Sequence, residues 1–514
     1  MSDSNTGEYD LIFDKDVPVP MSDGTVLRAN VFRPHGDGTF PVVLAKGAYG
    51  KDIPFRDGYR PQWDRLKEIY PDLDSNGTTG RFLRWETVDP ERWVPEGFAV
   101  VTVQSRGSGK SPGYLDTYSP TETRDYAEAI DWAGTQPWSN GKVGLLGVSY
   151  FATKQWQVAA LQPKHLAAMV PWEGCCDFYR EWSRHGGIRT RFPIDWWPRQ
   201  ILPNQHGNGD NPRLDPDTGE QPNGTALSPA MLEGNRSAFP DDILEHVLDD
   251  AWYHERTPDF SRITVPFLSA GNWGGPGLHL RGNIEGYLAA ASTEKWLSVH
   301  IGTHFESFYM PDYVAMQKRF LGHYLRGDDN GWETEPKVQI SVRGPNGAER
   351  RMENEWPLAR TEWTKWYLDG DALSLETTAA AADASTPYEA LGDGLNFTTP
   401  PFETETEFTG PLMARLYVSS STTDLDLFAT LRLLDPTGDE VVFVGAHEQT
   451  PVTRGWLRAS HRKTDPKRSL PYRPYHSHDE IQKIEPDEIV ALHVEIWPTS
   501  IVCPPGYRLV LTLQ

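Results

Sequence analysis

The chain has 514 residues, of which 38% are hydrophobic, so it is long enough for two or three domains with sizeable cores. It carries 49 Lys and Arg against 72 Asp and Glu, which gives a formal net charge of −23. A chain this acidic is not expected to bind nucleic acid or an anionic membrane, because both attract basic patches.

The first residues and the cysteines predict a cytoplasmic protein. No basic stretch followed by an apolar one opens the chain, so we expect no signal peptide. No apolar run approaches the roughly 20 residues that a membrane-spanning helix needs. Cys175, Cys176 and Cys503 form an odd and sparse set, which suits a reducing compartment better than a disulfide framework.

The first third of the chain alternates between predicted strands and helices. Apolar strands are predicted over residues 27–34, 41–47, 98–104, 143–148 and 166–172. A helix is predicted over 121–136, where Tyr126, Ile130 and Ala133 recur at helical spacing, and another follows Ser149. Nearly continuous apolar strands separated by helices predict an α/β fold, with a parallel sheet covered on both faces.

The pattern changes twice after residue 174. Residues 175–262 are rich in Pro, Gly, Asn, Trp and Arg and interrupt the alternation. It resumes with strands at 265–273 and 295–301 and a helix near 312–326. From about residue 336, short segments of alternating polarity are separated by turn signals, which predicts an antiparallel β-sandwich.

A lone serine stands where the strand 143–148 ends and a helix begins. Gly147 precedes Ser149 by two residues. This order of strand, Gly-x-Ser and helix is typical of a nucleophile elbow, in which a sharp turn raises the serine hydroxyl at the end of a sheet. The alternative is a serine that only caps the helix, which is common after strands.

Several stretches resemble the CocE/NonD hydrolases, the group of cocaine esterase, α-amino-acid ester hydrolases and X-Pro dipeptidyl peptidases. They are VPVPMSDGTVLRANVFRP, SRGSGKSPG, AIDWAGTQPWSNGKVG, GKVGLLGVSYFATKQW and GWLRASHR. The resemblance keeps its order over nearly the whole chain. It implies an α/β-hydrolase domain of residues 1–174 and 263–335, a helical cap inserted at 175–262, and a C-terminal jelly-roll β-sandwich over 336–514. One departure is Ala152, where the family usually has glycine.

The resemblance also implies the base and the oxyanion donors. His304 lies just past the strand 295–301, where the family's histidine lies, whereas His300 falls inside that strand and is expected to pack there. Acyl transfer needs donors for the developing oxyanion. The backbone N–H of Tyr150, directly after the nucleophile, supplies one. Tyr49 occupies the position of the family's second donor, a tyrosine hydroxyl on an early loop.

The acid is missing from its usual place. In the resembling hydrolases an aspartate follows a Gly-Trp stretch, and the matching position in GNWGGPG is Gly274. The α/β-hydrolase fold allows one other place, the end of the strand after the nucleophile helix. Glu173 directly follows the strand 166–172 and is the predicted acid, with Asp177 in reserve. The alternative for Glu173 is a structural carboxylate paired with an arginine. If Glu173 fills the role, Gly274→Asp is expected to change little.

These residues predict a serine hydrolase that cleaves a carboxylic ester or amide through an acyl-enzyme. Ser149 is the nucleophile, His304 the base and Glu173 the acid. The reaction needs no metal or organic cofactor, and the partner is a small ester or amide. Three alternatives stay open: an X-Pro dipeptidyl peptidase, an acyltransferase with the same triad, and a binding protein with an inactive hydrolase core. The oligomeric state also stays open, a homo-oligomer included.

The substrate pocket is defined only by composition. The candidates for lining an acyl pocket, suited to an aromatic or anionic group, are Trp182, Arg189, Arg191, Trp196 and Trp197. The alternative is a solvated basic face whose arginines pair with nearby acids.

Two other motifs carry no function in this interpretation. The stretch SRGSGKS (105–111) ends like a phosphate-binding loop, but it lacks the first glycine and Pro112 follows it. His476, His478 and Asp479 are metal-ligand types without a second ligand cluster, so no metal site is predicted.

Overall fold

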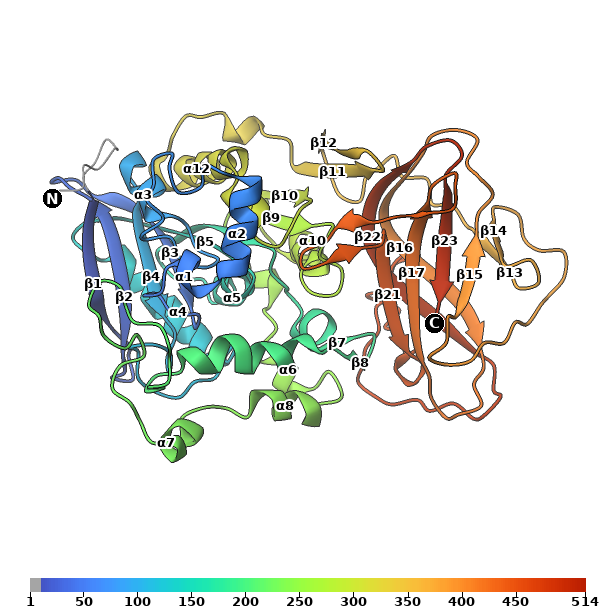
Figure 1. The fold of residues 1–514 in the computed structure, drawn as a ribbon, viewed down its shortest axis with the longest axis horizontal. Coiled ribbons are helices and arrows are strands. Elements are labelled where there is room, and N and C mark those ends of the chain that lie inside the picture. The colour runs from blue at the N-terminus through green and yellow to red at the C-terminus, as the bar shows by residue number, and fades with distance from the viewer. Residues whose placement is uncertain (1–10) are drawn as a thin grey trace.

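A mostly parallel sheet forms the centre of the first part of the chain (Figure 1). The computed structural model describes residues 11–514. Neighbouring strands pair in the order β1–β2–β4–β3–β5–β6–β9–β10, antiparallel up to β4 and parallel afterwards. Their bounds are β1 Leu11–Pro20, β2 Val26–Pro34, β3 Phe40–Gly47, β4 Ala99–Gln104, β5 Ser139–Val148, β6 Leu166–Trp172, β9 Phe267–Asn272 and β10 Lys295–His300.

Helices cover both faces of this sheet, as the apolar strands require. They are α1 Phe55–Gly58, α2 Arg60–Ile69, α3 Pro90–Trp93, α4 Pro120–Gly134, α5 Tyr150–Ala159, α10 Leu280–Ala289, α11 Glu306–Tyr309 and α12 Pro311–Arg326. Successive strand residues point to opposite faces. On β3, Val43 therefore shares a core with Leu321 of α12, whereas Val42 shares the other core with Ile130 of α4 and Ile284 of α10.

The predicted strands and helices of this part are confirmed to within a few residues, and the strand 166–172 has the predicted bounds. The edge strand β1 has no counterpart in the prediction. Its sequence contains Asp14, Lys15 and Asp16, and its pairing with β2 is interrupted between Asp14 and Val17. A half-buried, bulged edge strand lacks the apolar run by which the central strands are recognised.

Short helices and irregular chain make up residues 175–262. The helices are α6 Phe192–Trp196, α7 Pro229–Gly234, α8 Phe239–Glu245 and α9 Ala251–His254, with a small hairpin of β7 Arg184–His185 and β8 Ile188–Arg189. Two π-helical turns lie at Phe178–Ser183 and Trp197–Ile201. The segment is held by buried aromatic rings, among them Trp182 and Trp196, whose centroids are 5.1 Å apart.

The C-terminal part is all β and lies beside the sheet domain (Figure 1). Its strands are β13 Tyr367–Asp369, β14 Ser374–Glu376, β15 Leu395–Thr398, β16 Thr406–Val418, β17 Asp426–Leu434, β18 Glu440–Val441, β19 Phe443–Val444, β20 Gln449–Thr450, β21 Thr453–Arg458, β22 Val490–Cys503 and β23 Arg508–Leu513. The long strands pair antiparallel, β16 with β22 and β17 with both β21 and β23. Leu427, Leu457 and Leu492 belong to one buried hydrophobic core of this part.

The two parts are joined by paired strands and by ion pairs. β11 (Val338–Gly344) adds to β10 in parallel, and β12 (Gly347–Glu353) pairs with β11, so residues after 336 first extend the N-terminal sheet. Arg281, at the start of α10, pairs with Glu181 at 2.8 Å and with Glu495 of β22 at 2.9 Å. The domain boundaries at 174/175, 262/263 and 335/336 stay predictions.

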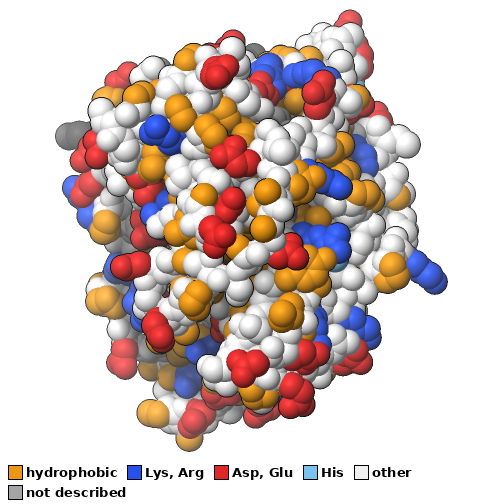
Figure 2. Space-filling view, turned by 90° about the vertical axis from the view of Figure 1, so that its right-hand side faces the viewer, with side chains coloured by type: hydrophobic (Ala, Val, Ile, Leu, Met, Phe, Trp, Pro, Cys, Tyr) orange, Lys and Arg blue, Asp and Glu red, His pale blue; other side chains and the backbone are white. Residues whose placement is uncertain are grey.

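The surface carries both charges. Figure 2 shows the end of the molecule formed by the C-terminal domain, where acidic and basic side chains are scattered among hydrophobic ones. Within residues 11–514, no helix has both the length and the apolar character to cross a membrane.

Candidate active site

Ser149 lies in the sharp turn between β5 and α5. Its backbone has φ 60° and ψ −113°, a conformation that non-glycine residues seldom adopt. The side chain makes no capping hydrogen bond to α5, so the helix-cap interpretation of this serine is wrong. Gly147 is required by the same turn, since a Cβ there would lie 2.6 Å from Cβ of Phe151. The turn therefore leaves the hydroxyl free for other partners.

Two side chains meet the Ser149 hydroxyl. Its Oγ lies 3.1 Å from Nε2 of His279, a residue just before α10. The Tyr49 hydroxyl also interacts with the Ser149 side chain. Burial lowers the pKa of His279 well below its usual range, and its Nδ1 has no hydrogen-bond partner within residues 11–514. His279 is thus neutral and has no acid behind it.

His304 lies between two buried carboxylates. Its Nδ1 is 2.8 Å from Oε2 of Glu173, and its Nε2 is 3.1 Å from Oε1 of Glu86. Burial lowers the pKa of His304, but the charges and hydrogen bonds of Glu173 and Glu86 outweigh burial and raise it to about 10. The ring stacks on His279, with 5.1 Å between centroids. His304 therefore lies next to His279, which bonds Ser149, but its own Nε2 is bonded to Glu86 in this structure.

Glu173 sits where the chain leaves β6. It is fully buried, and its φ of 49° is in the left-handed region. Its Oε1 accepts a hydrogen bond from Asn272 at 3.2 Å and lies 3.5 Å from Nε2 of His300. Burial raises the pKa of the Glu173 carboxyl, although His304 and Asn272 act against it. Glu173 makes no ion pair with an arginine within residues 11–514, so the structural-carboxylate alternative lacks its partner.

The other nearby acids are engaged elsewhere. Asp177 pairs with Arg180 at 2.9 Å and caps the turn that follows it. Glu306 accepts a hydrogen bond from the Thr303 amide at 3.1 Å. His300 is buried at the end of β10 and stacks on Trp172, with 5.3 Å between centroids.

Gly274 is covered by the C-terminal domain. A Cβ at Gly274 would lie 2.6 Å from the Val444 carbonyl oxygen and 2.9 Å from Cα of Gly445. The Gly274 carbonyl accepts a hydrogen bond from the Ala446 amide at 2.7 Å, and the Ala446 carbonyl accepts one from the His304 amide at 3.0 Å. The backbone of residues 444–446 thus takes the space of a side chain at position 274.

This packing corrects the expectation that Gly274→Asp is nearly neutral. We expect the variant to lose about 1–3 kcal/mol of stability, because overpacking against backbone atoms displaces the segment 444–446. Thermal melting of the variant checks this. Gly234→Ala is the control, since no atom of residues 11–514 outside its own turn lies within 4 Å of a Cβ there. A Gly274→Asp protein that melts with the parent would contradict the close packing.

Tyr49 and Tyr150 lie next to each other beside the Ser149 turn, with 5.4 Å between their ring centroids. The Tyr49 hydroxyl accepts a hydrogen bond from Nε1 of Trp196 at 2.8 Å, so its own proton is free to point toward Ser149. Tyr150 is the first residue of α5, where backbone N–H groups have no partner inside the helix. Its ring is held by a hydrogen bond from its hydroxyl to the buried Glu122.

The predicted pocket residues divide into two groups. Trp182, Trp196 and Trp197 are buried, and Trp196 reaches the site through Tyr49. Arg189 and Arg191 are exposed, and Arg191, with 85% of its side chain accessible, pairs with Asp195 at 2.8 Å. The two arginines therefore lie on a solvated face in this structure, and their place in the acyl pocket stays a prediction.

Three residues of the site are absent from the prediction. Glu86 and His279 meet the base and the serine, and His447 of the C-terminal domain lies over His304, with 5.4 Å between ring centroids. None stands in a recognisable motif, and each reaches the site from a distant part of the chain. Within residues 11–514, no group of three or more His, Cys, Asp or Glu side chains is arranged to hold a metal ion.

The site is closed to solvent in this state. Ser149 is 6% exposed and His304 is 4% exposed. The segment 444–447 and the Trp196 side of the inserted segment cover it.

Comparison with known proteins places the chain in a family. Residues 23–306 match the model of the X-Pro dipeptidyl-peptidase (S15) family, and residues 330–514 match that of the X-Pro dipeptidyl-peptidase C-terminal non-catalytic domain. A CocE/NonD family hydrolase from Staphylococcus aureus superposes with a TM-score of 0.87 at 35% identity, covering 98% of this chain and 85% of that one. Cocaine esterase from Rhodococcus sp. (strain MB1 Bresler) is 24% identical over 97% of this chain and 90% of its own length.

A more distant structure supports the fold alone. An α-amino acid ester hydrolase superposes with a TM-score of 0.70 at 18% identity, over 100% of this chain and 90% of that one. The shared architecture is an N-terminal α/β domain followed by an all-β domain. The chain belongs to the S15 family, in its CocE/NonD group, and is a hydrolase that acts on esters or amides.

Proposed function

We propose that the chain cleaves a carboxylic ester or amide through an acyl-enzyme, with Ser149 as nucleophile, His304 as base and Glu173 as acid. The observation that carries this proposal is the 2.8 Å contact of Glu173 with Nδ1 of His304, beside a strained serine turn. A carboxylate on Nδ1 holds the imidazole in the tautomer whose Nε2 accepts a proton, and it stabilises the cation that forms.

The reaction then follows from these atoms. Oγ of Ser149 attacks the carbonyl carbon while its proton passes to Nε2 of His304. The imidazolium returns that proton to the leaving alcohol or amine, and the acyl group stays on Ser149. Water then attacks the acyl carbon while its proton passes to His304, the bond from the acyl carbon to Oγ breaks, and His304 returns the proton to Ser149 as the acid leaves. No step needs a metal or an organic cofactor.

His304 is preferred to His279 as the base, although His279 is the ring bonded to Ser149 here. A base must hold the serine proton as a cation, and His279 is buried with a strongly lowered pKa and no partner on Nδ1 within residues 11–514. His304 has Glu173 behind it. The proposal therefore requires Nε2 of His304 to leave Glu86 and approach Ser149 during turnover.

The oxyanion is assigned to the Tyr150 N–H and the Tyr49 hydroxyl. We expect Tyr49→Phe to lower kcat by roughly 10²–10³, as loss of one oxyanion donor does in other hydrolases. The ring packing stays, so the melting temperature should change little. Steady-state ester hydrolysis measures the effect. Trp196→Phe is the control, because it removes the donor to Tyr49 but keeps the hydroxyl. Equal losses in both variants would contradict the assignment.

An ester is the favoured substrate. Cocaine esterase matches this chain over nearly its full length, which supports an ester more directly than the family's peptidase name does. The buried tryptophans around Tyr49 suit an aromatic or apolar acyl group. The three cysteines are unpaired and buried, in keeping with a cytoplasmic location, which stays a prediction.

A fluorophosphonate probe and a substrate panel test the function. We expect the probe to label the parent once, on Ser149, and not to label Ser149→Ala. Neutral aryl esters should be turned over faster than a dipeptidyl-proline anilide, and added alcohols should not divert the acyl group. Faster turnover of the anilide than of the esters would identify the protein as a dipeptidyl peptidase. Transfer of the acyl group to an added alcohol would identify it as an acyltransferase. Absence of labelling would overturn the proposal in favour of an inactive binding protein.

A further inference from the structure

Glu86 contributes a second carboxylate to the catalytic histidine. It lies in the segment between β3 and β4 and is 2% exposed. Its Oε1 is 3.1 Å from Nε2 of His304, the nitrogen that the reaction needs free for Ser149. The ordinary triad has no use for a carboxylate at this atom, because the acid acts through Nδ1.

The backbone holds Glu86 in this position. Its φ of 61° is in the left-handed region, as are those of Ser149 and Glu173. Strained residues of this kind persist where the surroundings over-determine them, and they gather at functional sites. The Glu86 carbonyl accepts a hydrogen bond from the amide of Val148, at 3.0 Å. Glu86 is thus tied to the residue directly before the nucleophile.

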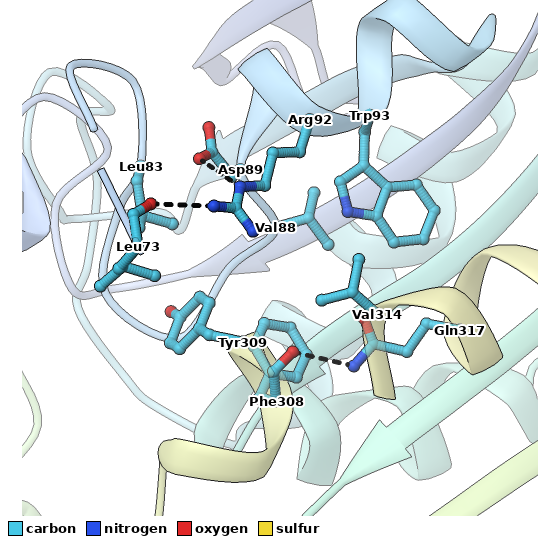
Figure 3. Close-up of a pocket in the computed structure, with 10 residues that line it drawn as sticks. All are labelled: Leu73, Leu83, Val88, Asp89, Arg92, Trp93, Phe308, Tyr309, Val314 and Gln317. Atoms are coloured by element: carbon cyan, nitrogen blue, oxygen red, sulfur yellow. Dashed lines mark hydrogen bonds and ion pairs between the residues drawn. The ribbon is translucent and has the colours of Figure 1, made fainter. Parts of the chain in front are cut away.

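The chain on both sides of Glu86 is also fixed. The Arg84 carbonyl accepts a hydrogen bond from the Tyr309 hydroxyl at 3.3 Å. Val88 and Asp89 follow Glu86 in the chain, and Figure 3 shows them beside a small cavity that Phe308 and Tyr309 also line. Asp89 caps α3 through the Glu91 amide. Residues on both sides of Glu86 are therefore held in place by hydrogen bonds.

Counting protons defines the state of the site. The Nδ1 contact with Glu173 requires a proton on Nδ1 when Glu173 is ionised. A hydrogen bond between Nε2 and Glu86 requires a second proton, on the ring or on the carboxyl group. The site in this structure therefore holds two protons, one at Nδ1 and one between Nε2 and Glu86, whereas a histidine that acts as base holds only the proton at Nδ1. Nε2 is not free to accept the proton of Ser149.

We propose that Glu86 is a positioning residue that holds His304 in a resting state, and that its contact with Nε2 must open before Ser149 can pass its proton to His304. This inference rests on the proposed roles of Ser149 and His304. In the opening step the shared proton leaves to water, and Glu86 stays a carboxylate. The Ser149 O–H bond then breaks, its proton bonds to Nε2, and Oγ bonds to the carbonyl carbon.

Other titratable groups act on His304, on its two carboxylates or on Ser149. They are Glu173 after β6, His279 before α10, His447 of the C-terminal domain, His300 of β10, Tyr49 after β3, and Glu306 of α11. Burial lowers the pKa of His447 to about 4 and that of His300 to about 3, so both rings are neutral. Glu86 and Glu173 are the carboxylates that touch the ring, and they favour its protonated form.

The test measures the protonation of His304 without turnover. In the Ser149→Ala protein, the ¹⁵N shifts of the His304 ring are followed against pH, with and without Glu86→Gln. Removing a negative neighbour destabilises the imidazolium, so we expect the midpoint to fall by about one pH unit or more. In the active enzyme, the acid limb of kcat/KM on a neutral ester should move to lower pH by a similar amount. Glu91→Gln is the control and should move neither, because this carboxylate of the same segment is partly exposed and accepts a hydrogen bond from the Thr79 hydroxyl at 2.8 Å.

Several outcomes decide the proposal. An unchanged His304 midpoint in folded Glu86→Gln would overturn it. A change only in KM for cationic esters would also overturn it and assign Glu86 to substrate binding. If Glu86→Gln does not fold, Glu86→Asp replaces it, because the shorter side chain draws the charge back by one methylene. We expect this variant to lower the His304 midpoint by less than the shift expected for Glu86→Gln. An unchanged midpoint in folded Glu86→Asp would then overturn the proposal. Failure of probe labelling on Ser149 would instead refute the proposed function, so the two failures are distinguishable.

Discussion

Replacing Ser149 by alanine is expected to lower kcat for ester hydrolysis by roughly 10⁵–10⁶, as loss of the nucleophile does in other serine hydrolases. Oγ is the atom that attacks, and the hydroxyl of the neighbouring Tyr150 is held by Glu122. The side chain makes no capping bond to α5, so the fold loses only its contacts with His279 and Tyr49. Steady-state kinetics and thermal melting of the purified variant measure both effects.

A second buried serine provides the control for this variant. Ser108 donates a hydrogen bond to the Ala48 carbonyl at 3.0 Å and has no contact with Ser149 or His304 within residues 11–514. Ser108→Ala is expected to lower stability slightly and to keep activity within a few fold of the parent. If Ser149→Ala keeps more than about one per cent of the parent's activity, the nucleophile lies elsewhere.

Replacing Glu173 by glutamine is expected to lower kcat by roughly 10³–10⁴ in a folded protein. The amide can present its N–H₂ group to Nδ1 of His304 and so select the wrong tautomer. It also cannot offset the charge that the ring gains during attack. In the opposite orientation of the amide, its N–H₂ group faces Asn272, which now donates to Oε1 of Glu173 at 3.2 Å. The loss should not add to that of Ser149→Ala, because the residues act as a unit.

Asp177→Asn is the matched control for the acid. Its carboxylate lies four residues further on and pairs with Arg180 at 2.9 Å, away from the histidine. We expect this variant to melt earlier but to keep near-normal turnover. Near-normal turnover in folded Glu173→Gln would instead leave a Ser149–histidine dyad without an acid. It would also remove the reason to prefer His304 over His279, since Glu173 is what distinguishes the two rings.

Local signals in the sequence were sufficient for most of the fold. Strands such as 166–172 are apolar on both faces and bounded by helices, so periodicity and length identify them. The Ser149 turn is set by a glycine two residues earlier and by the helix that follows, which are local features as well. Glu173 could be predicted because its place at the end of β6 follows from the order of strands.

The rest of the site depends on contacts between distant segments. His279 is 130 residues from Ser149, and Glu86 is 218 residues from His304. Neither position is marked by periodicity or by a motif. The expectation that Gly274→Asp changes little rested on the local sequence alone, whereas the Val444 carbonyl that would meet a side chain there belongs to the C-terminal part of the chain. Arg189 and Arg191 were grouped with the tryptophans by sequence distance, whereas both side chains are exposed to solvent.

The most direct test is the mass of the acylated enzyme. An ester with a hindered acyl group, such as p-nitrophenyl pivalate, slows the second half of the reaction and lets the intermediate accumulate. After acid quenching, intact-mass measurement and peptide mapping locate the acyl group. The account predicts one acyl group, on the peptide that contains Ser149, and none in Ser149→Ala. Turnover of the ester with no acyl group on Ser149, or with the group on another residue, would contradict it.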